Sequence, residues 1–183
     1  MSKLLRRTLK VSIAPAVLMI AGKLLGIIIA NVIYKLDFFI DNQIKGIFSI
    51  QLYYTDSATT LLVNSVSNLI MVLVLAVPTL YFIIKTSVYQ SAFENPRTIV
   101  KITKFNIAHW ITKDDTSFLS IFIWASFLLI ASLITIAQTI QGTCYDWVGI
   151  IAGVLTIFGV WGTIKTFEIE IDKIYPKEEK LYR

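Results

Sequence analysis

The chain has 183 residues, of which 56% are hydrophobic and 16% are charged, and its formal net charge is +5 at pH 7. Soluble domains are about 45–50% apolar and about 25% charged, so this composition is that of a membrane protein and disfavours a soluble enzyme. It excludes a disordered chain and, with one Cys and one His, a disulfide scaffold and most zinc sites.

Four stretches of the sequence are long and apolar enough to cross a membrane. A helix needs about 20 mainly apolar residues to span a hydrocarbon core of about 30 Å. The stretches cover residues 11–34, 58–84, 118–138 and 147–167. Because open strands leave backbone groups unsatisfied in lipid, we expect an all-α integral membrane protein with one domain over residues 1–183. The alternative is three full spans with a first segment that lies partly in the membrane interface.

Basic residues precede the first apolar stretch, as they do in a signal peptide: Lys3, Arg6, Arg7 and Lys10. The apolar run that begins at Val11 is followed by Lys23 and then by a second apolar run. Because no small-residue cleavage site ends the first run, we expect an uncleaved signal anchor.

The distribution of Lys and Arg predicts the orientation of the spans. The N-terminal segment, the connection over residues 85–117 and the tail over residues 168–183 are rich in them, whereas the two other connections are poor. The positive-inside rule then places both termini in the cytoplasm, and the pattern suits a bacterial inner membrane. The charge of +5 therefore indicates topology and attraction to anionic headgroups on the cytoplasmic side, not a nucleic-acid partner.

An amphipathic helix is predicted within the connection between the second and third spans, over about residues 96–111. Asn95 and Pro96 are typical of an N-cap and a first helical residue. We expect this helix to lie in the cytoplasmic membrane interface, and the alternative is packing on the ends of the bundle. Asp114 and Asp115 are expected to cap the third span. The expected lipid-interface residues are Arg97, Lys101, Lys104 and Trp110.

Two other segments allow alternative structures. The connection over residues 36–57 is unusually apolar, so we expect it to rest on the membrane surface or on another protein, with packing on the chain's own helices as the alternative. Residues 167–172 alternate apolar and acidic side chains. Alternation is typical of a strand, but a lone strand is unstable, so a helical continuation of the fourth span is the alternative.

Lys23 is the one charged residue well inside a predicted span. A lysine at that depth is costly and is often functional. No Asp or Glu lies within a span, which disfavours an internal ion pair. We expect a structural lysine that is hydrogen-bonded or that extends to the cytoplasmic side. The alternatives are an ion or substrate pathway, or a counter-ion supplied by a partner subunit.

Three asparagines form a candidate intramembrane polar site with Lys23. Asn64 and Asn68 are four residues apart and share one face of the second span, near Ser65 and Ser67. Asn31 of the first span is expected at a similar depth to Asn64. We expect these amides to form interhelical hydrogen bonds worth about 0.5–2 kcal/mol each. A polar cavity that leads toward Lys23 is the alternative.

Small residues mark the expected helix contacts. Gly22 and Gly26 form a GxxxG pair in the first span, and Gly149 and Gly153 form another in the fourth. Such pairs let two backbones approach closely, within one chain or between chains. Pro78 lies inside the second span and predicts a kink there.

Groups that carry enzyme chemistry are sparse in this sequence. His109 is the one histidine, and it falls on the predicted amphipathic helix without a clear catalytic partner. Capping explains the Asp114–Asp115 pair better than a metal site does, and we expect Cys144 to be a free thiol. The sequence therefore predicts neither a catalytic constellation nor a cofactor or metal site.

The apolar loop at residues 36–57, the glycine pairs and the missing catalytic groups together favour one function. We expect a non-catalytic integral membrane subunit, or an assembly or scaffold protein, of a larger membrane complex, with a protein partner or a second copy as its contact. The alternative is a small oligomeric transporter or channel with a polar path near Lys23, Asn31, Asn64 and Asn68.

Overall fold

The computed structural model describes the backbone of residues 3–40, 52–54, 56–94 and 117–174. The predicted amphipathic helix lies outside these residues, with its interface residues Arg97, Lys101, Lys104 and Trp110. His109, Asp114 and Asp115 also lie outside them. The elements in chain order are α1 (Lys3–Tyr34), β1 (Phe38–Ile40), β2 (Leu52–Tyr54), α2 (Ser57–Glu94), α5 (Ser117–Ile140) and α6 (Asp146–Ile174).

The four predicted apolar segments are confirmed as helices long and apolar enough to cross a membrane. The qualifying segments are Val11–Tyr34, Ser57–Ser87, Leu119–Ile140 and Asp146–Glu168. The first segment is part of one continuous helix of 32 residues, in which Lys23 causes no break. α2 likewise continues through Pro78, and the kink at that residue stays a prediction. α6 continues to Ile174, so residues 167–172 are helical and the strand interpretation is wrong.

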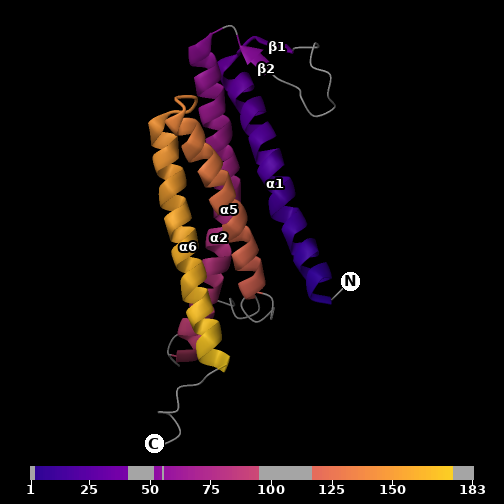
Figure 1. Cartoon of the computed structure of the whole chain (residues 1–183), viewed down its shortest axis with the longest axis vertical. Coiled ribbons are helices and arrows are strands. Elements are labelled where there is room, and N and C mark those ends of the chain that lie inside the picture. Colours follow the sequence, from indigo (N-terminus) through magenta and orange to yellow (C-terminus); the bar gives the residue numbers. More distant parts are fainter. Residues whose placement is uncertain (1–2, 41–51, 55, 95–116, 175–183) are drawn as a thin grey trace, which may run out of the picture.

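The four helices form an antiparallel bundle, in which α1 begins at the same end as α6 ends (Figure 1). We call this the N-terminal end. The opposite end, where α2 begins and α5 turns into α6, is the loop end. α2 contacts each of the other three helices, whereas α1 packs mainly on α2 and α5. α2 is therefore the central helix of the bundle.

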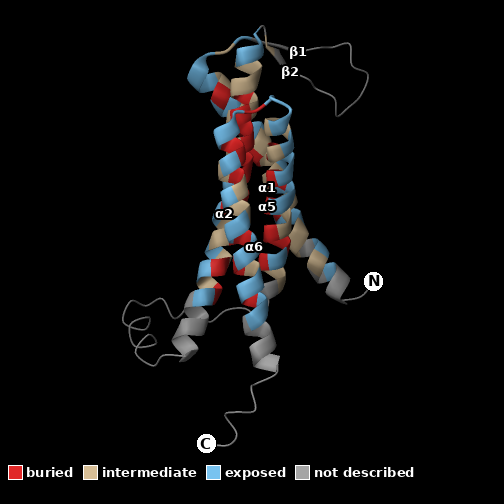
Figure 2. Ribbon diagram, turned by 60° about the vertical axis from the view of Figure 1, so that its left-hand side comes forward, coloured by how far each residue is buried: buried red, intermediate tan, exposed pale blue. Residues whose placement is uncertain are grey.

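The hydrophobic core lies between α2, α5 and α6, and α1 packs against it from one side. Leu75 of α2, Leu128 and Ala131 of α5 and Ala152 of α6 are buried in one cluster. Of the apolar window of α1, 17% is buried, compared with 44% for α2 and α5. Figure 2 shows the buried residues concentrated along the inner faces of the helices. α1 is thus a peripheral helix with a largely bare apolar surface.

A tight turn joins α5 to α6. Gly142 has a φ of 71°, in the left-handed region that glycine adopts without a steric penalty. The N–H of Gly142 donates to the carbonyl of Thr139 at 2.9 Å, and the N–H of Thr143 donates to that of Gln138 at 2.9 Å. This pair of bonds is a Schellman motif, which satisfies carbonyls that the end of a helix leaves free.

A short β-hairpin, which the sequence analysis did not predict, precedes α2. β1 and β2 pair antiparallel, with Phe38 opposite Tyr54 and Ile40 opposite Leu52. A two-stranded hairpin is marginally stable alone. Here the hydroxyl of Tyr54 donates to Asn31 Oδ1 at 3.0 Å, which ties the hairpin to the last turn of α1.

The helices reach different heights at the loop end. The N–H of Tyr145, just after the α5–α6 turn, donates to Ser65 Oγ at 2.8 Å, so the turn lies level with Ser65. Ser65 comes eight residues after the start of α2 at Ser57, which is about 12 Å along a helix. The first two turns of α2 and the end of α1 therefore project beyond the α5–α6 turn (Figure 1).

Candidate functional site

Three polar side chains join three helices near the loop end of the bundle. The ammonium of Lys23 on α1 donates to Asn68 Oδ1 on α2. The Nδ2 of Asn68 donates in turn to Gln138 Oε1 on α5. Asn68 is fully buried, and hydrogen bonds are stronger where water is excluded. We call these three residues the polar chain.

Two glycines of α1 bring Lys23 within reach of Asn68. A Cβ on Gly22 would lie 3.2 Å from Met71 Cα, and a Cβ on Gly26 would overlap the backbone of Ser67. The GxxxG pair thus sets the close contact of α1 with α2, as predicted. Lys23 lies between these two glycines in sequence, so its side chain leaves α1 beside the contact and bonds Asn68.

The polar chain lies at different heights on its three helices. Lys23 is near the middle of α1, whereas Gln138 is two residues from the end of α5 at Ile140. Lys23, near the middle of α1, is therefore level with the last turn of α5, because α1 projects beyond α5 at the loop end. The side chain of Lys23 meets a partner on the loop-end side of Met71. It is hydrogen-bonded in the bundle and does not extend to the N-terminal end.

The structure brings together some of the predicted polar residues and separates others. Asn68 makes the interhelical hydrogen bonds expected of it. Asn31 bonds Tyr54 of β2 and not the second span. Asn64 lines a cavity at the loop end, one turn of α2 above Asn68. The four predicted site residues therefore do not form one cluster.

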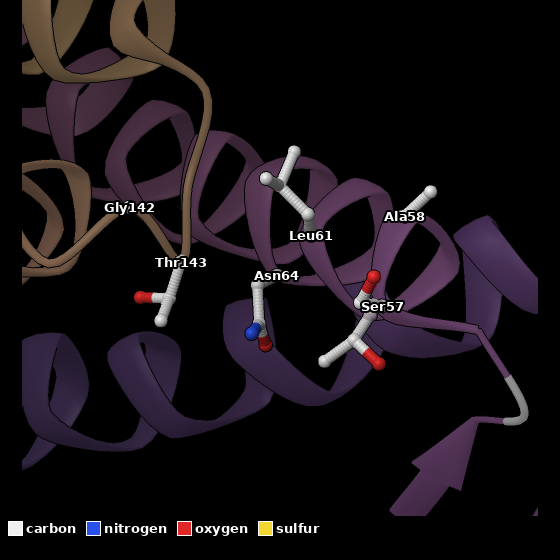
Figure 3. Close-up of a pocket in the computed structure, with 7 residues that line it drawn as sticks. Ser57, Ala58, Leu61, Asn64, Gly142 and Thr143 are labelled. Carbon is white, nitrogen blue, oxygen red and sulfur yellow. The ribbon is translucent and has the colours of Figure 1, made fainter.

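That cavity, which we call the notch, is the step created by the unequal helix heights. It has a volume of about 440 Å³ and lies between the start of α2 and the α5–α6 turn. In Figure 3 the side chains of Asn64 and Thr143 point into the same space. The residues that line the notch are Ser57, Ala58, Thr60, Leu61, Asn64, Gly142 and Thr143.

A polar stripe connects the notch to the polar chain. Thr60, Asn64 and Asn68 follow each other at intervals of four residues, so they share one face of α2. Thr60 and Asn64 are partly buried, and Asn68 is fully buried. On the α5–α6 side, Thr143 lines the notch. The stripe therefore runs from an open cavity down to a lysine.

Two contacts in this region were not predicted from the sequence. Gln138 binds Asn68, and Ser65 binds the N–H of Tyr145. A polar residue such as Gln138, near the end of an apolar span, can be noticed in the sequence. Its partner cannot, because that depends on the register between α2 and α5. Cys144 is a free, buried thiol.

The second glycine pair is used differently from the first. A Cβ on Gly149 would lie 2.7 Å from Thr139 Oγ1, so Gly149 allows α6 to approach α5 just after the turn. A Cβ on Gly153 would meet nothing within 4 Å among the described residues, so Gly153 makes no such approach in this bundle. Farther along α6, Gly159 and Gly162 pack against Leu128 and Ile83.

The chemistry of the site is that of hydrogen bonding and positive charge. The site contains one ammonium, three amides and three hydroxyls, which are groups that can hold an anion or a hydrogen-bonding ligand. Among the described residues, no group of three or more His, Cys, Asp or Glu side chains could hold a metal ion. Comparison of the chain with protein-family models, curated proteins and solved structures gave no match.

Proposed function

We propose that the chain is a non-catalytic integral membrane subunit or assembly protein of a larger membrane complex. The observation that carries this proposal is the projecting end of the first two helices. We call it the α1–α2 tip and define it as residues 28–34 of α1 and 57–64 of α2. The tip extends beyond the α5–α6 turn and exposes large apolar side chains.

The length of α6 indicates how far the membrane covers the bundle. Its uncharged stretch over residues 147–164, between Asp146 and Lys165, has 18 residues, or about 27 Å, close to the hydrocarbon thickness of about 30 Å. The aromatic residues Tyr145 and Trp147 are exposed at the α5–α6 turn, and such residues favour the membrane interface. The tip then projects about 12 Å beyond that interface.

The apolar surface of the tip is large for a water-exposed segment. Ile28 is 56% exposed, Val32 is 70% exposed and Ile33 is 65% exposed. Contiguous apolar patches outside the membrane core commonly mark contacts with other proteins. We infer that a protein partner covers this face of α1 in the assembled complex.

The distribution of positive charge supports an orientation for this complex. We propose that the N-terminal end faces the cytoplasm, with the tip on the opposite side, and that the membrane is a bacterial inner membrane. The basic residues of the N-terminal segment and of the tail support this orientation through the positive-inside rule.

Native mass spectrometry of the full chain, purified from its own membrane into lipid nanodiscs, tests the proposal. We expect a discrete complex of fixed stoichiometry with other proteins. The double substitution Val32→Ser and Ile33→Ser should remove the partner. The matched double substitution Ile13→Ser and Val17→Ser, at residues that are 60% and 58% exposed lower on the same helix, should leave it bound. A monomer or a homo-oligomer with wild-type protein contradicts the proposal.

The polar stripe favours a second candidate function, a small oligomeric transporter or channel. It leads from the notch at the loop end to the buried Asn68 and to the partly buried Lys23. Chloride and phosphate flux into proteoliposomes tests this candidate, because the loss of the ammonium in Lys23→Leu should abolish the flux. Equal flux with wild-type protein and the variant contradicts it.

A further inference from the structure

We propose that the notch, the polar stripe and Lys23 form a binding site for a phosphate group carried by an anionic lipid or by a soluble phosphate ester. This proposal is independent of the proposed role as a subunit. It rests on the charge of Lys23, on the hydroxyls of the notch and on the height of the site in the bundle.

The positive charge of Lys23 has no countercharge in the spans. No Asp or Glu occurs in residues 11–34, 57–87, 119–140 or 147–167. An ammonium within a membrane span is costly without an anion, and a neutral amide such as Asn68 offsets that cost only in part. An ammonium has three N–H donors. Within the described residues one of them is bonded, to Asn68 Oδ1, which leaves two for an anionic ligand.

The notch supplies groups that suit a phosphate and the hydroxyl-rich group attached to it. Ser57, Thr60 and Thr143 contribute hydroxyls, and Asn64 contributes an amide. The hydroxyls of Thr60 and Thr143 donate to the carbonyls of Asp56 and Gln138, so in this arrangement they can accept from ligand hydroxyls. The hydroxyl of Ser57 and the amide of Asn64 can donate to phosphate oxygens. The volume of about 440 Å³ lies in the range of about 300–1,000 Å³ found for small-molecule sites. The notch can therefore hold a headgroup, with its negative charge directed down the stripe toward Lys23.

The height of the site matches that of a lipid headgroup. The α5–α6 turn, with the exposed aromatic residues Tyr145 and Trp147, lies at the expected interface. Thr143 in this turn lines the notch, and Gln138 at the end of α5 belongs to the polar chain. A lipid phosphate at the interface would thus lie beside the notch. Lys23 would lie below that phosphate, at the level of Asn68. Lys23 itself is only partly buried, so part of its side chain stays accessible.

Lipid retention by the full chain measures binding of the lipid-borne phosphate. The protein is reconstituted in nanodiscs of phosphatidylcholine with a minor fraction of phosphatidylglycerol, and lipids that stay bound are counted by native mass spectrometry. We expect Lys23→Met to lower the retained phosphatidylglycerol about tenfold, as the loss of one charge-assisted hydrogen bond predicts. Asn64→Leu, which changes the lining of the notch and leaves Lys23 in place, should lower it about threefold.

The control is Lys165→Met, which removes the same charge at the N-terminal end, where Lys165 lies 5.1 Å from the ring centre of Trp161. This variant should retain phosphatidylglycerol as the wild type does. If Lys23→Met and Lys165→Met lower the retained phosphatidylglycerol equally, the lipid is attracted only by the net charge of the protein, and the proposal is wrong. If Lys23→Met does not fold, Asn64→Leu decides, and unchanged retention in that variant overturns the proposal.

A second arm distinguishes the two sources of phosphate. Glycerol 3-phosphate is titrated calorimetrically into the protein in nanodiscs of phosphatidylcholine alone. Saturable binding that Asn64→Leu weakens assigns the site to a soluble ester. Retention of phosphatidylglycerol that depends on Asn64 and Lys23, without such calorimetric binding, assigns it to a lipid. If neither probe binds in a manner that depends on these residues, the site does not bind phosphate.

Discussion

Gly26 of α1 lies directly against the backbone of Ser67 of α2, with no space for a side chain between them. This contact and the one between Gly22 and Met71 hold the peripheral helix α1 on the bundle. They also place Lys23 beside Asn68, so the polar chain depends on how closely the two helices approach.

Replacement of Gly26 by Ala tests this dependence. The new Cβ would come closer to Ser67 Cα than real Cβ atoms approach, so α1 must move away from α2. We expect a loss of about 1–3 kcal/mol in the free energy of unfolding, which is typical of overpacking. Thermal unfolding in detergent measures it. Gly153→Ala is the matched control, because a Cβ there meets nothing within 4 Å, and equal losses in both variants would contradict the interpretation.

Removal of the Asn68 amide should be the most costly polar substitution in the bundle. Asn68→Leu deprives Lys23 of its acceptor and Gln138 of its donor in a buried place. A buried group left unsatisfied costs about 1–3 kcal/mol, and a charged group costs more. We expect the free energy of unfolding to fall by about 3 kcal/mol.

A double-mutant cycle separates these two effects. Lys23→Met combined with Asn68→Leu replaces the charge and its acceptor together, and should recover part of the loss, because two apolar groups replace a broken pair. Asn31→Leu, which loses one hydrogen bond to Tyr54, should cost only about 1 kcal/mol. Additive losses in the Lys23 and Asn68 variants would show that the two side chains do not interact.

The spans were predictable because long apolar runs are a local property of the sequence. The runs that begin at Val11 and Ser57 each exceed the length that a helix needs to cross a bilayer, so no knowledge of tertiary contacts is required. The β-hairpin was missed because β1 and β2 have three residues each. So short a segment shows no period, and its pairing depends on the turn and on Tyr54 binding Asn31.

The site was predictable in its residues but not in its geometry. Lys23 and Asn68 are conspicuous because polar groups are rare in a span. Their pairing with Gln138, and the placement of Asn31 away from Asn64, depend on the register between helices of unequal height. That register is fixed by contacts such as Gly26 with Ser67 and Tyr145 with Ser65, which no local pattern encodes.

Ser65 should hold the α5–α6 turn at its height. Its buried hydroxyl donates to the carbonyl of Leu61 at 2.7 Å and accepts from the N–H of Tyr145 at 2.8 Å. Ser65→Ala leaves that N–H without its acceptor and should lower the free energy of unfolding by about 1–3 kcal/mol. Ser126→Ala removes a hydroxyl that donates to the Phe122 carbonyl within its own helix, and should be nearly neutral. Thermal unfolding of both variants checks the difference, and equal stability of the two would refute it.

At two helix ends, the stability of the protein should change in opposite directions when a glycine is removed or introduced. Gly142 has a φ of 71° and Lys35 a φ of 50°. A side chain in the left-handed region costs about 1–2 kcal/mol. Gly142→Ala should therefore destabilise the protein by about 1 kcal/mol, and Lys35→Gly should stabilise it by somewhat less. Since a Cβ on Gly142 meets nothing within 4 Å, only the backbone conformation contributes to the expected loss of stability in Gly142→Ala. A stabilising Gly142→Ala would contradict this account.

The proposed orientation predicts which end of the bundle a membrane-impermeant reagent reaches. Gln141 in the α5–α6 turn and Glu168 near the opposite end of α6 are both exposed. In a Cys144→Ser background, Gln141→Cys should react with a charged maleimide in intact cells. Glu168→Cys should react only after the membrane is permeabilised, because the positive-inside rule places the basic end of α6 in the cytoplasm. Labelling of Glu168→Cys in intact cells, with protection of Gln141→Cys, would show that the orientation is opposite to the proposed one and that the α1–α2 tip is on the cytoplasmic side.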